Sequence, residues 1–459
     1  MTLSGRKTLA FLAAAAFLFS HSGVAHAQAV TLTLPQAQAM ARAAIDQGRP
    51  ELAYSLSDGL LQADPRNGYA YYIRALALAS VRDYGESRKA ARRAYRFSAT
   101  NLQRHEAANL AARIAFEDER FTLSQLWLRR AVQYAPDDVT RAQTANDFRR
   151  VRARNPLNFR LSFSVTPSDN VNNGANSPVN LIDGVPVVGT LSPSAQALSG
   201  VITRAELRAS YRLAQSERYE TRLTGRANRR QVSLNDPVAG ISGGDLSSST
   251  LELGLSQFLT SGGSPDSYWR LDATAGRVWY GGDLLYNSYE LAAQRRQNLS
   301  EGLFLTFGGS AERQIDEAPP LSNSTVLSAF ASVSYTIAGG GKLGAYIRYS
   351  DTENRAINRD FSQWTGVLSF QPGRPVGPAE LNLTLGYSAS DYPIYAVGFP
   401  IPGGREDTSV FGGVTATFND WSYMGFVPTV SVRSQKSRSN VSRFDVDETS
   451  VSMGIRSEF

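Results

Sequence analysis

Thr449-Ser-Val-Ser-Met-Gly-Ile-Arg-Ser-Glu-Phe459 ends the chain. Its large apolar side chains are Val451, Met453, Ile455 and the terminal Phe459, and polar or small residues fill the positions between them. Because successive side chains in a strand point to opposite faces, this segment predicts a strand with one apolar and one polar face. A membrane β-barrel needs such a strand at its end, since the last strand must pair with the first to leave no open edge.

The same period of two runs through residues 157–459. For example, Leu207 and Tyr211 alternate with Glu206 and Arg208, and Leu383 and Leu385 flank Thr384. Counting all such segments gives about fourteen, each near the roughly ten residues that a tilted membrane strand needs. The fold class that we predict is multidomain, with an α-helical part followed by an antiparallel transmembrane β-barrel of about fourteen strands.

The connections between these segments differ in length. Residues 214–217, 339–342 and 419–425 are short turns. The longer polar connections are residues 169–200, 231–248, 351–362, 389–407 and 436–448. Short turns at one end and long loops at the other are typical of bacterial outer-membrane barrels, and an even strand number returns both barrel ends to the periplasm.

Aromatic residues near the expected strand ends are typical of membrane-interface girdles. They are Tyr211, Trp269, Tyr286, Tyr289, Tyr349, Trp364, Tyr387 and Trp421. A soluble β-sandwich is the alternative, because its strands also alternate. Mid-strand Arg and Glu on the polar face, with an apolar face that continues to the last residue, favour the membrane barrel.

Residues 1–27 have the pattern of a cleaved export signal. Arg6 and Lys7 precede an apolar run, and Ala25-His26-Ala27 offers small residues at the positions that a signal peptidase reads. The run is too short for a membrane helix. We therefore expect the mature chain to begin at Gln28 in an export compartment.

Residues 28–156 predict a periplasmic domain of paired helices in repeats. Ala75, Tyr84, Ser87 and Ala94 recur 37 residues later. Their counterparts are Ala112, Phe121, Ser124 and Ala131. Small residues inside both helices and an aromatic residue at the turn are typical of tetratricopeptide repeats. We expect about three helix pairs, stacked as a short solenoid.

The amino-acid composition disfavours several kinds of catalytic and metal-binding site. The chain has no Cys and three His, of which His105 alone follows the export signal. Cysteine catalysis, thiolate metal sites and His-based triads are therefore disfavoured. We expect no enzyme, catalytic residue, cofactor or metal, and no nucleic-acid partner. Asp245, Asp316, Asp351 and Asp360 are expected to be solvated loop residues.

Charged residues on the polar face of the predicted strands would face the barrel lumen. The candidate lumen-facing charges are Arg204, Glu206, Arg208, Arg212, Arg222, Arg226, Arg270 and Asp272. Arginine is in excess, and the whole chain carries a formal charge of +6. Such charges either pair with one another, or select anions or guide an acidic client.

The order of an export signal, a short tetratricopeptide-like domain and a barrel resembles the surface lipoprotein assembly modulators (Slam). The segment Thr166-Pro-Ser-Asp-Asn-Val-Asn-Asn-Gly-Ala-Asn-Ser177 resembles the Asn-rich turn after that family's first barrel strand. The ending at Phe459 resembles the signal that the barrel-insertion machinery reads, with Ser457 as a departure. The resemblance implies an outer-membrane protein that promotes surface display or secretion of an exported client (lipo)protein. Its expected partners are that client, the insertion machinery and outer-membrane lipid.

Two other functions fit the same residues. An exopolysaccharide export pore also combines periplasmic helical repeats with a barrel, and a diffusion porin with an accessory helical domain is the third interpretation. Periodicity alone does not separate them.

Overall fold

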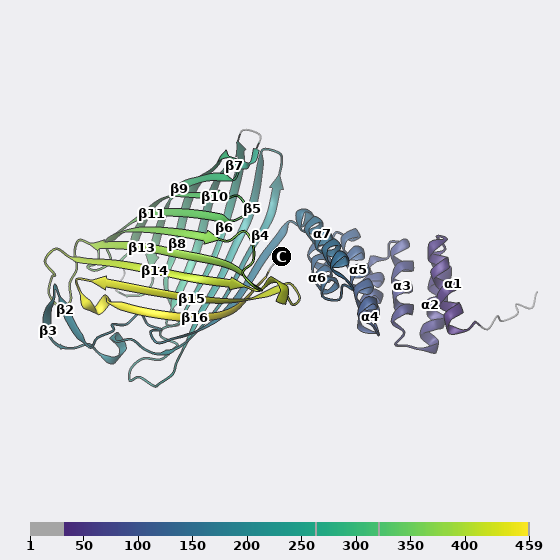
Figure 1. The fold of residues 1–459 in the computed structure, drawn as a ribbon, viewed down its shortest axis with the longest axis horizontal. Coiled ribbons are helices and arrows are strands. Elements are labelled where there is room, and N and C mark those ends of the chain that lie inside the picture. Colours follow the sequence, from purple (N-terminus) through teal and green to yellow (C-terminus); the bar gives the residue numbers. More distant parts are fainter. Residues whose placement is uncertain (1–31, 262–263, 320–321, 458–459) are drawn as a thin grey trace, which may run out of the picture.

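The computed structural model describes residues 32–261, 264–319 and 322–457, in which a row of helices is followed by a barrel (Figure 1). Within these residues seven α-helices precede fourteen antiparallel strands that close into a barrel, as the sequence predicts. The expected export signal, residues 1–27, and Phe459 lie outside the described residues.

The helices follow one another closely along the chain. They are α1 (Leu34–Asp46), α2 (Pro50–Ala63), α3 (Gly68–Ser80), α4 (Tyr84–Arg96), α5 (Asn101–Glu117), α6 (Phe121–Gln133) and α7 (Asp138–Arg154). Asn67, Asp83, Thr100 and Asp137 cap four of them by accepting a backbone N–H with their side chains. One core of small and apolar residues runs from α1 to α7. None of the described helices is both long and apolar enough to span a bilayer.

The 37-residue repeat has a local physical cause. The Ser87 hydroxyl donates to the carbonyl oxygen of Ala75 at 2.7 Å, and the Ser124 hydroxyl donates to that of Ala112 at 2.8 Å. Each bond joins the second helix of a pair to the first, and all four residues are buried. A small hydroxyl residue at this position therefore allows close helix approach and satisfies a buried polar group.

Each strand of the barrel pairs with the next in sequence. The strands are β1 (Leu157–Ser168), β4 (Gly200–Gln215), β5 (Tyr219–Leu234), β6 (Ser248–Ser261), β7 (Ser264–Tyr280), β8 (Asp283–Ser300), β9 (Leu303–Asp316), β10 (Ser324–Thr336), β11 (Lys342–Asn354), β12 (Phe361–Gln371), β13 (Glu380–Tyr392), β14 (Arg405–Thr417), β15 (Phe426–Ser439) and β16 (Val446–Ser457). Since β1 follows α7 directly, we name the barrel end next to the helices the proximal end and the other the distal end (Figure 1).

The barrel closes where β16 meets β1. Over the described residues this junction has four paired positions, from Ser162 opposite Arg456 to Val165 opposite Met453. By comparison, β1 has twelve paired positions with β4. Side chains extend the junction, because Thr166 Oγ1 donates to Ser452 Oγ at 2.9 Å and Ser168 Oγ donates to Glu448 Oε1 at 2.9 Å.

The outer face of the barrel is apolar all the way round. Every strand exposes at least one large apolar side chain. In barrel order from β1 they are Phe163, Leu207, Leu223, Leu253, Leu271, Leu291, Phe307, Leu327, Ile347, Leu368, Leu385, Val410, Val432 and Met453. A continuous apolar belt of this size is not tolerated in water, and it identifies a membrane-spanning barrel.

Six of the eight aromatic residues expected in girdles are largely exposed. They are Tyr211, Trp269, Tyr289, Trp364, Tyr387 and Trp421. Tyr286 differs, because it lies three residues before Tyr289 on the same strand and therefore faces the lumen. The expectation of a girdle position for Tyr286 was wrong.

The distal loops interlock. The loop after β1 contains a hairpin that the sequence analysis did not predict, β2 (Val179–Ile182) and β3 (Val185–Thr190). Ile182 forms a bridge with Val441 in the loop before β16, and Asp183 N–H donates to the Asn440 carbonyl at 2.8 Å. Short 3-10 turns lie in two of these distal loops, at Pro193–Ala195 and Ser442–Phe444, and a third, Asn419–Trp421, lies in the proximal turn between β14 and β15.

Two of the aspartates expected in solvated loops have other surroundings. Asp316 ends β9 and is buried, where it accepts bonds from Arg359 and from the Ser322 N–H. Asp351 lies within β11. Burial of Asp316 depends on Arg359, which is remote in sequence and reaches it only in the folded barrel.

We predict that Leu385→Arg lowers the unfolding free energy of the lipid-embedded barrel by about 2–4 kcal/mol. Leu385 is 57% exposed on the outer face near the middle of β13, so a cation there would lie in the bilayer core. The matched control is Thr384→Arg, one residue away on the lumenal face, which should cost much less. Urea unfolding in lipid vesicles measures both, and equal costs would contradict an outward Leu385.

A second prediction concerns pH. The backbone N–H and the hydroxyl of Thr140 both donate to Asp137, which holds the pKa of its carboxyl below the usual range. A carboxyl whose pKa is lower in the folded state stabilises the fold at pH values above its ordinary, unfolded pKa. This stability is lost as the pH falls through the depressed pKa of the folded state. Helix melting followed by circular dichroism at 222 nm should therefore be less pH-dependent below about pH 5 in Asp137→Asn, which keeps a cap without titrating. An unchanged pH dependence would exclude Asp137 as its source.

Candidate functional site: a helical groove that leads to the barrel lumen

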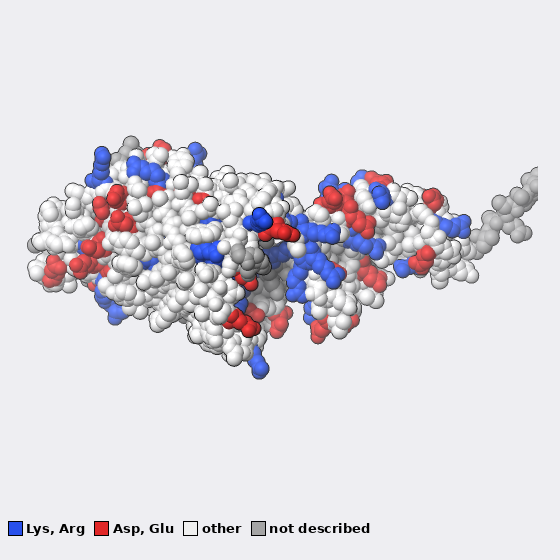
Figure 2. Space-filling view, turned by 90° about the horizontal axis from the view of Figure 1, so that it is seen from above, with Lys and Arg blue, Asp and Glu red and all other residues white. Residues whose placement is uncertain are grey.

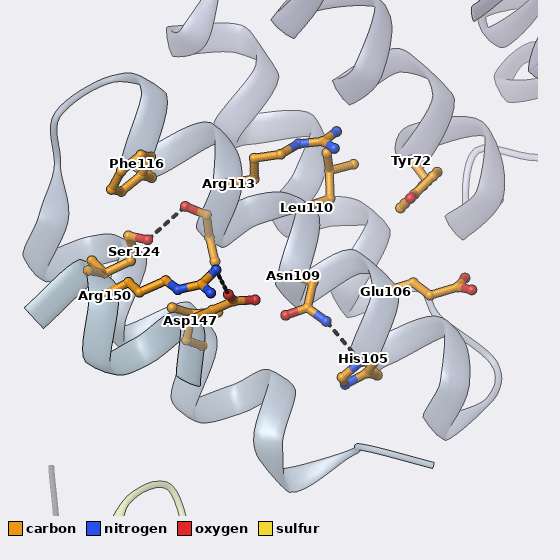
Figure 3. A pocket seen from close by; sticks show the side chains of 13 residues that line it. Tyr72, His105, Glu106, Asn109, Leu110, Arg113, Phe116, Ser124, Asp147 and Arg150 are labelled. Carbon is orange, nitrogen blue, oxygen red and sulfur yellow. Dashed lines mark hydrogen bonds and ion pairs between the residues drawn. The ribbon is translucent and has the colours of Figure 1, made fainter. Parts of the chain in front are cut away.

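The helical stack contains a groove of about 570 Å³. Side chains from α3, α5, α6 and α7 converge on it (Figure 3). Tyr72, Leu110, Phe116, Leu128 and Val151 supply its apolar lining. A hollow of this size with mainly apolar walls accepts a short extended peptide or a small apolar group.

Polar groups line the edges of the groove. The buried His105 bonds through Nδ1 to the Ala131 carbonyl oxygen at 2.9 Å, and its Nε2 meets Asn109 Nδ2 at 2.8 Å (Figure 3). Because a carbonyl oxygen only accepts, Nδ1 donates and Nε2 accepts. Both ring nitrogens are thus engaged, and His105 joins α5 to α6 rather than offering a free base.

The groove continues along the stack toward the first helices. A second hollow of about 280 Å³ shares Tyr72 and Glu106 with it and adds Arg42 and Tyr69. Burial raises the pKa of the Tyr69 phenol. The two hollows together extend along the stack from α1 to α7.

The last helix is held firmly against the barrel. Asn155, which follows α7, is buried and donates through Nδ2 to Gln125 Oε1 at 2.6 Å and to Thr122 Oγ1 at 3.1 Å. Arg212 of β4 donates through Nη2 to the carbonyl oxygens of Ala153 and Arg154 at 3.2 and 3.0 Å. The Arg212 bonds satisfy two open carbonyls at the C-terminal end of α7 and join it to β4, while the Asn155 bonds join the residue after α7 to α6.

The proximal mouth of the lumen contains a polar cavity of about 560 Å³. Its arginines are Arg152 of α7 and, from the barrel, Arg160, Arg208, Arg222, Arg226 and Arg270. Ion pairs hold four of them. Arg208 and Arg226 bind Glu206 at 2.5 and 3.0 Å, Arg226 also reaches Glu252 at 3.4 Å, Arg270 binds Asp272 at 2.9 Å, and Arg222 binds Glu220.

The eight charges proposed from the sequence fall into three groups. Arg208, Arg222, Arg226 and Arg270 line the mouth cavity, and Glu206 and Asp272 bind them. Arg212 is directed to the end of α7 instead. Arg204 lies nearer the distal end, opposite Arg230 in the strand register.

Four further charged residues at the mouth were not proposed from the sequence. Arg160, Glu220 and Glu252 share the polar face of their strands with the proposed charges. The alternation of polar and apolar residues along these strands could have identified all three. Arg152 could not be found that way, because its place depends on how α7 meets the barrel.

A third cavity of about 420 Å³ lies at the distal end of the lumen. Arg405 lines it and stacks on the ring of Phe444, with its guanidinium carbon 3.4 Å from the ring centroid. Asn173, from the loop after β1, also lines this cavity. That loop therefore lies beside the distal ends of β12 to β16, the strands that follow β1 in the barrel order.

The Asn-rich segment after β1 shapes this loop. Asn170 bonds both the N–H and the carbonyl of Gly174, at 2.8 and 2.9 Å. Asn172 donates to the carbonyls of Ser194 and Gln196. A side chain at Gly174 would collide with the Gln196 carbonyl, 2.2 Å from an ideal Cβ. The asparagines thus bond the backbone of their own loop.

The residues proposed as an insertion signal lie on the outer face of β16. Val451, Met453 and Ile455 are all exposed there, and Met453 lies opposite Val165 at the closing junction. Among the described residues, no group of three or more His, Cys, Asp or Glu side chains could hold a metal ion.

Comparison with known proteins finds similarity in structure alone. No protein-family model matches the chain, and neither does any curated protein sequence. A bacterial polysaccharide outer membrane secretin is similar at 10% identity over 66% of this chain and 98% of its own, with a TM-score of 0.35. OmpT of Vibrio cholerae is similar at 12% identity over 66% of this chain and 97% of its own, with a TM-score of 0.33.

The translocator domain of the autotransporter NalP from Neisseria meningitidis is similar at 13% identity, over 71% of this chain and 99% of its own, with a TM-score of 0.27. Likenesses this remote do not assign a function to the chain.

We predict that Arg226 and Glu252 are coupled by about 0.5–1 kcal/mol in a double-mutant cycle of alanine substitutions. Both side chains are about one-third exposed to the lumen, so screening keeps the coupling small. Unfolding free energies of the two single variants and the double variant in lipid vesicles give the value. A coupling that does not fall in high salt would contradict an electrostatic origin.

Proposed function

We propose that this chain is an outer-membrane translocation factor that promotes surface display or secretion of an exported client protein. One observation carries the proposal. Helix α7 lines the groove through Arg150 and Val151 and lines the mouth of the lumen through Arg152. A segment bound in the groove is therefore already beside the mouth.

Strand number and loop length set the proposed orientation. Because the number of strands is even, the start of β1 and the end of β16 lie at the same end of the barrel. The helices are at that end. The long, interlocked loops are at the other end. In outer-membrane barrels the long loops face the exterior, so we place the helices in the periplasm.

The two cavities would have different roles in translocation of the client. The groove has apolar walls that suit an extended polypeptide, and the bonds of Asn155 and Arg212 hold it at a constant direction to the barrel. Capture at this position raises the local concentration of the client at the mouth. His105, which lines the groove, has both of its ring nitrogens engaged.

The surface lipoprotein assembly modulators are the family that we propose. The order of domains and the strand number support this assignment. The Asn-rich loop adds less, because its side chains serve the loop backbone. The client would be a lipoprotein or a related secreted protein, and the insertion machinery and outer-membrane lipid remain the other proposed partners.

An exopolysaccharide export pore is the second candidate. The arginine-rich mouth favours it, since an acidic sugar polymer would also be attracted there. The apolar groove argues against it, because a hydrated sugar chain gains little from such walls. A plain diffusion porin would require neither the groove nor its fixed connection to the barrel.

We predict that deleting residues 28–156, with the export signal retained, reduces client display much more than barrel insertion. The reason is that strand pairing closes the barrel without the helices. Surface labelling of an exported lipoprotein produced in the same cells measures display, and heat-modifiable gel migration measures insertion.

A point variant sharpens this test. Arg113→Glu reverses an exposed charge in the groove, and the matched control Arg92→Glu reverses one on α4 that lines none of the described cavities. Display should fall in the first variant alone. If display is unchanged by the deletion while sugar export or solute uptake falls, the translocation proposal is wrong.

A further inference from the structure

The arginines of the proximal mouth lie in one row across neighbouring strands. Arg160 of β1 is opposite Arg208 of β4, which is opposite Arg226 of β5. Glu252 of β6 follows in the same row. Like charges directly opposite each other in a sheet repel, so three adjacent arginines are unfavourable unless negative charge neutralises them.

The protein neutralises this row only in part. Arg208 and Arg226 share Glu206, and Arg226 also reaches Glu252. Within the described part of the chain, Arg160 and Arg152 form no ion pair. The six arginines that line the cavity therefore face four partner carboxylates, which leaves two positive charges beside open space.

The space beside the row is lined by small residues. Ser210, Thr224 and Gly254 occupy the neighbouring row across the same strands. They leave the guanidinium groups accessible from the lumen. The view from above shows basic side chains gathered where the helices meet the barrel (Figure 2).

A guanidinium group presents a planar fork of N–H donors that matches a carboxylate. Several such groups in a row suit a chain that carries several carboxylates. The apolar groove opens beside this row through α7, which favours a polypeptide over a sugar polymer as the source of those carboxylates.

We infer that the proximal mouth is a binding site for an acidic segment of the client polypeptide, held by Arg152, Arg160 and the neighbouring arginine row. The inference rests on the proposed translocation function and names the chemistry of its substrate at the mouth. The groove would hold an apolar part of the client, while its acidic part enters the lumen.

The test uses the full chain purified in detergent and a fluorescein-labelled peptide of ten glutamates. We expect saturable binding by fluorescence anisotropy that weakens as salt is added. Arg152→Gln with Arg160→Gln should weaken binding about tenfold, because both charges are solvent-accessible and each contributes modestly. Neither substitution leaves a carboxylate without its partner, since neither arginine has one.

The matched control is Arg49→Gln with Arg66→Gln, which removes the same charge from exposed positions near the first helices. It should leave binding unchanged. Arg152→Lys with Arg160→Lys keeps the charge but removes the forks, and intermediate binding is expected. Heat-modifiable migration verifies that each variant keeps its barrel.

Three results would overturn the inference. The first is no binding of the glutamate peptide by the unmodified protein. The second is equal weakening in the control variant, which would mean a response to net charge alone. The third is binding of an oligogalacturonate of equal charge in place of the peptide, which would assign the mouth to an acidic sugar. Client display is measured separately, so this inference can fail while the translocation function stands.

Discussion

Every backbone N–H and C=O group inside a bilayer must find a partner within the protein, and the rest of this structure depends on that constraint. A sheet meets it only by closing on itself, which places the whole requirement on the junction of β1 with β16. Over the residues that the structure describes, that junction has four paired positions, with hydroxyl and carboxylate side chains bonding beyond them. Closure with an even number of strands also brings the helices and the C-terminal strand to one end. The position of the helical domain is thus a consequence of strand pairing.

The sequence predicted the barrel well because a period of two is a direct consequence of one lipid face and one lumenal face. The repeat in the helices was equally visible, since Ser87 and Ser124 serve the same bond 37 residues apart. Loops were less predictable. The β2–β3 hairpin is short and rich in turn residues, and its edge is satisfied by a loop more than 250 residues later. Asp316 was misjudged for the same reason, because Arg359 buries it only after the strands have assembled.

The candidate site, like the fold, could be predicted from the sequence only in part. Alternation assigns Arg208, Arg222, Arg226 and Arg270 to the polar face, yet it does not say which of them are neighbours. Strand register decides that, and it depends on pairing across strands far apart in sequence. The row formed by Arg160, Arg208 and Arg226 follows from the registers of β1 with β4 and of β4 with β5. Arg212 has the same parity and a different role, because the end of α7 lies within its reach.

Rigid attachment of the helices explains how two separate cavities can act on one substrate. With a flexible linker, the groove would take many positions relative to the barrel. The effective concentration of a bound client segment at the mouth would then be lower. Here Asn155 bonds α6 and the first residue of β1, and Arg212 bonds the end of α7 from β4. The groove therefore has one position relative to the lumen. Weak contacts in the groove and weak contacts at the mouth then add for any chain long enough to reach both, and neither cavity has to bind tightly enough to prevent release.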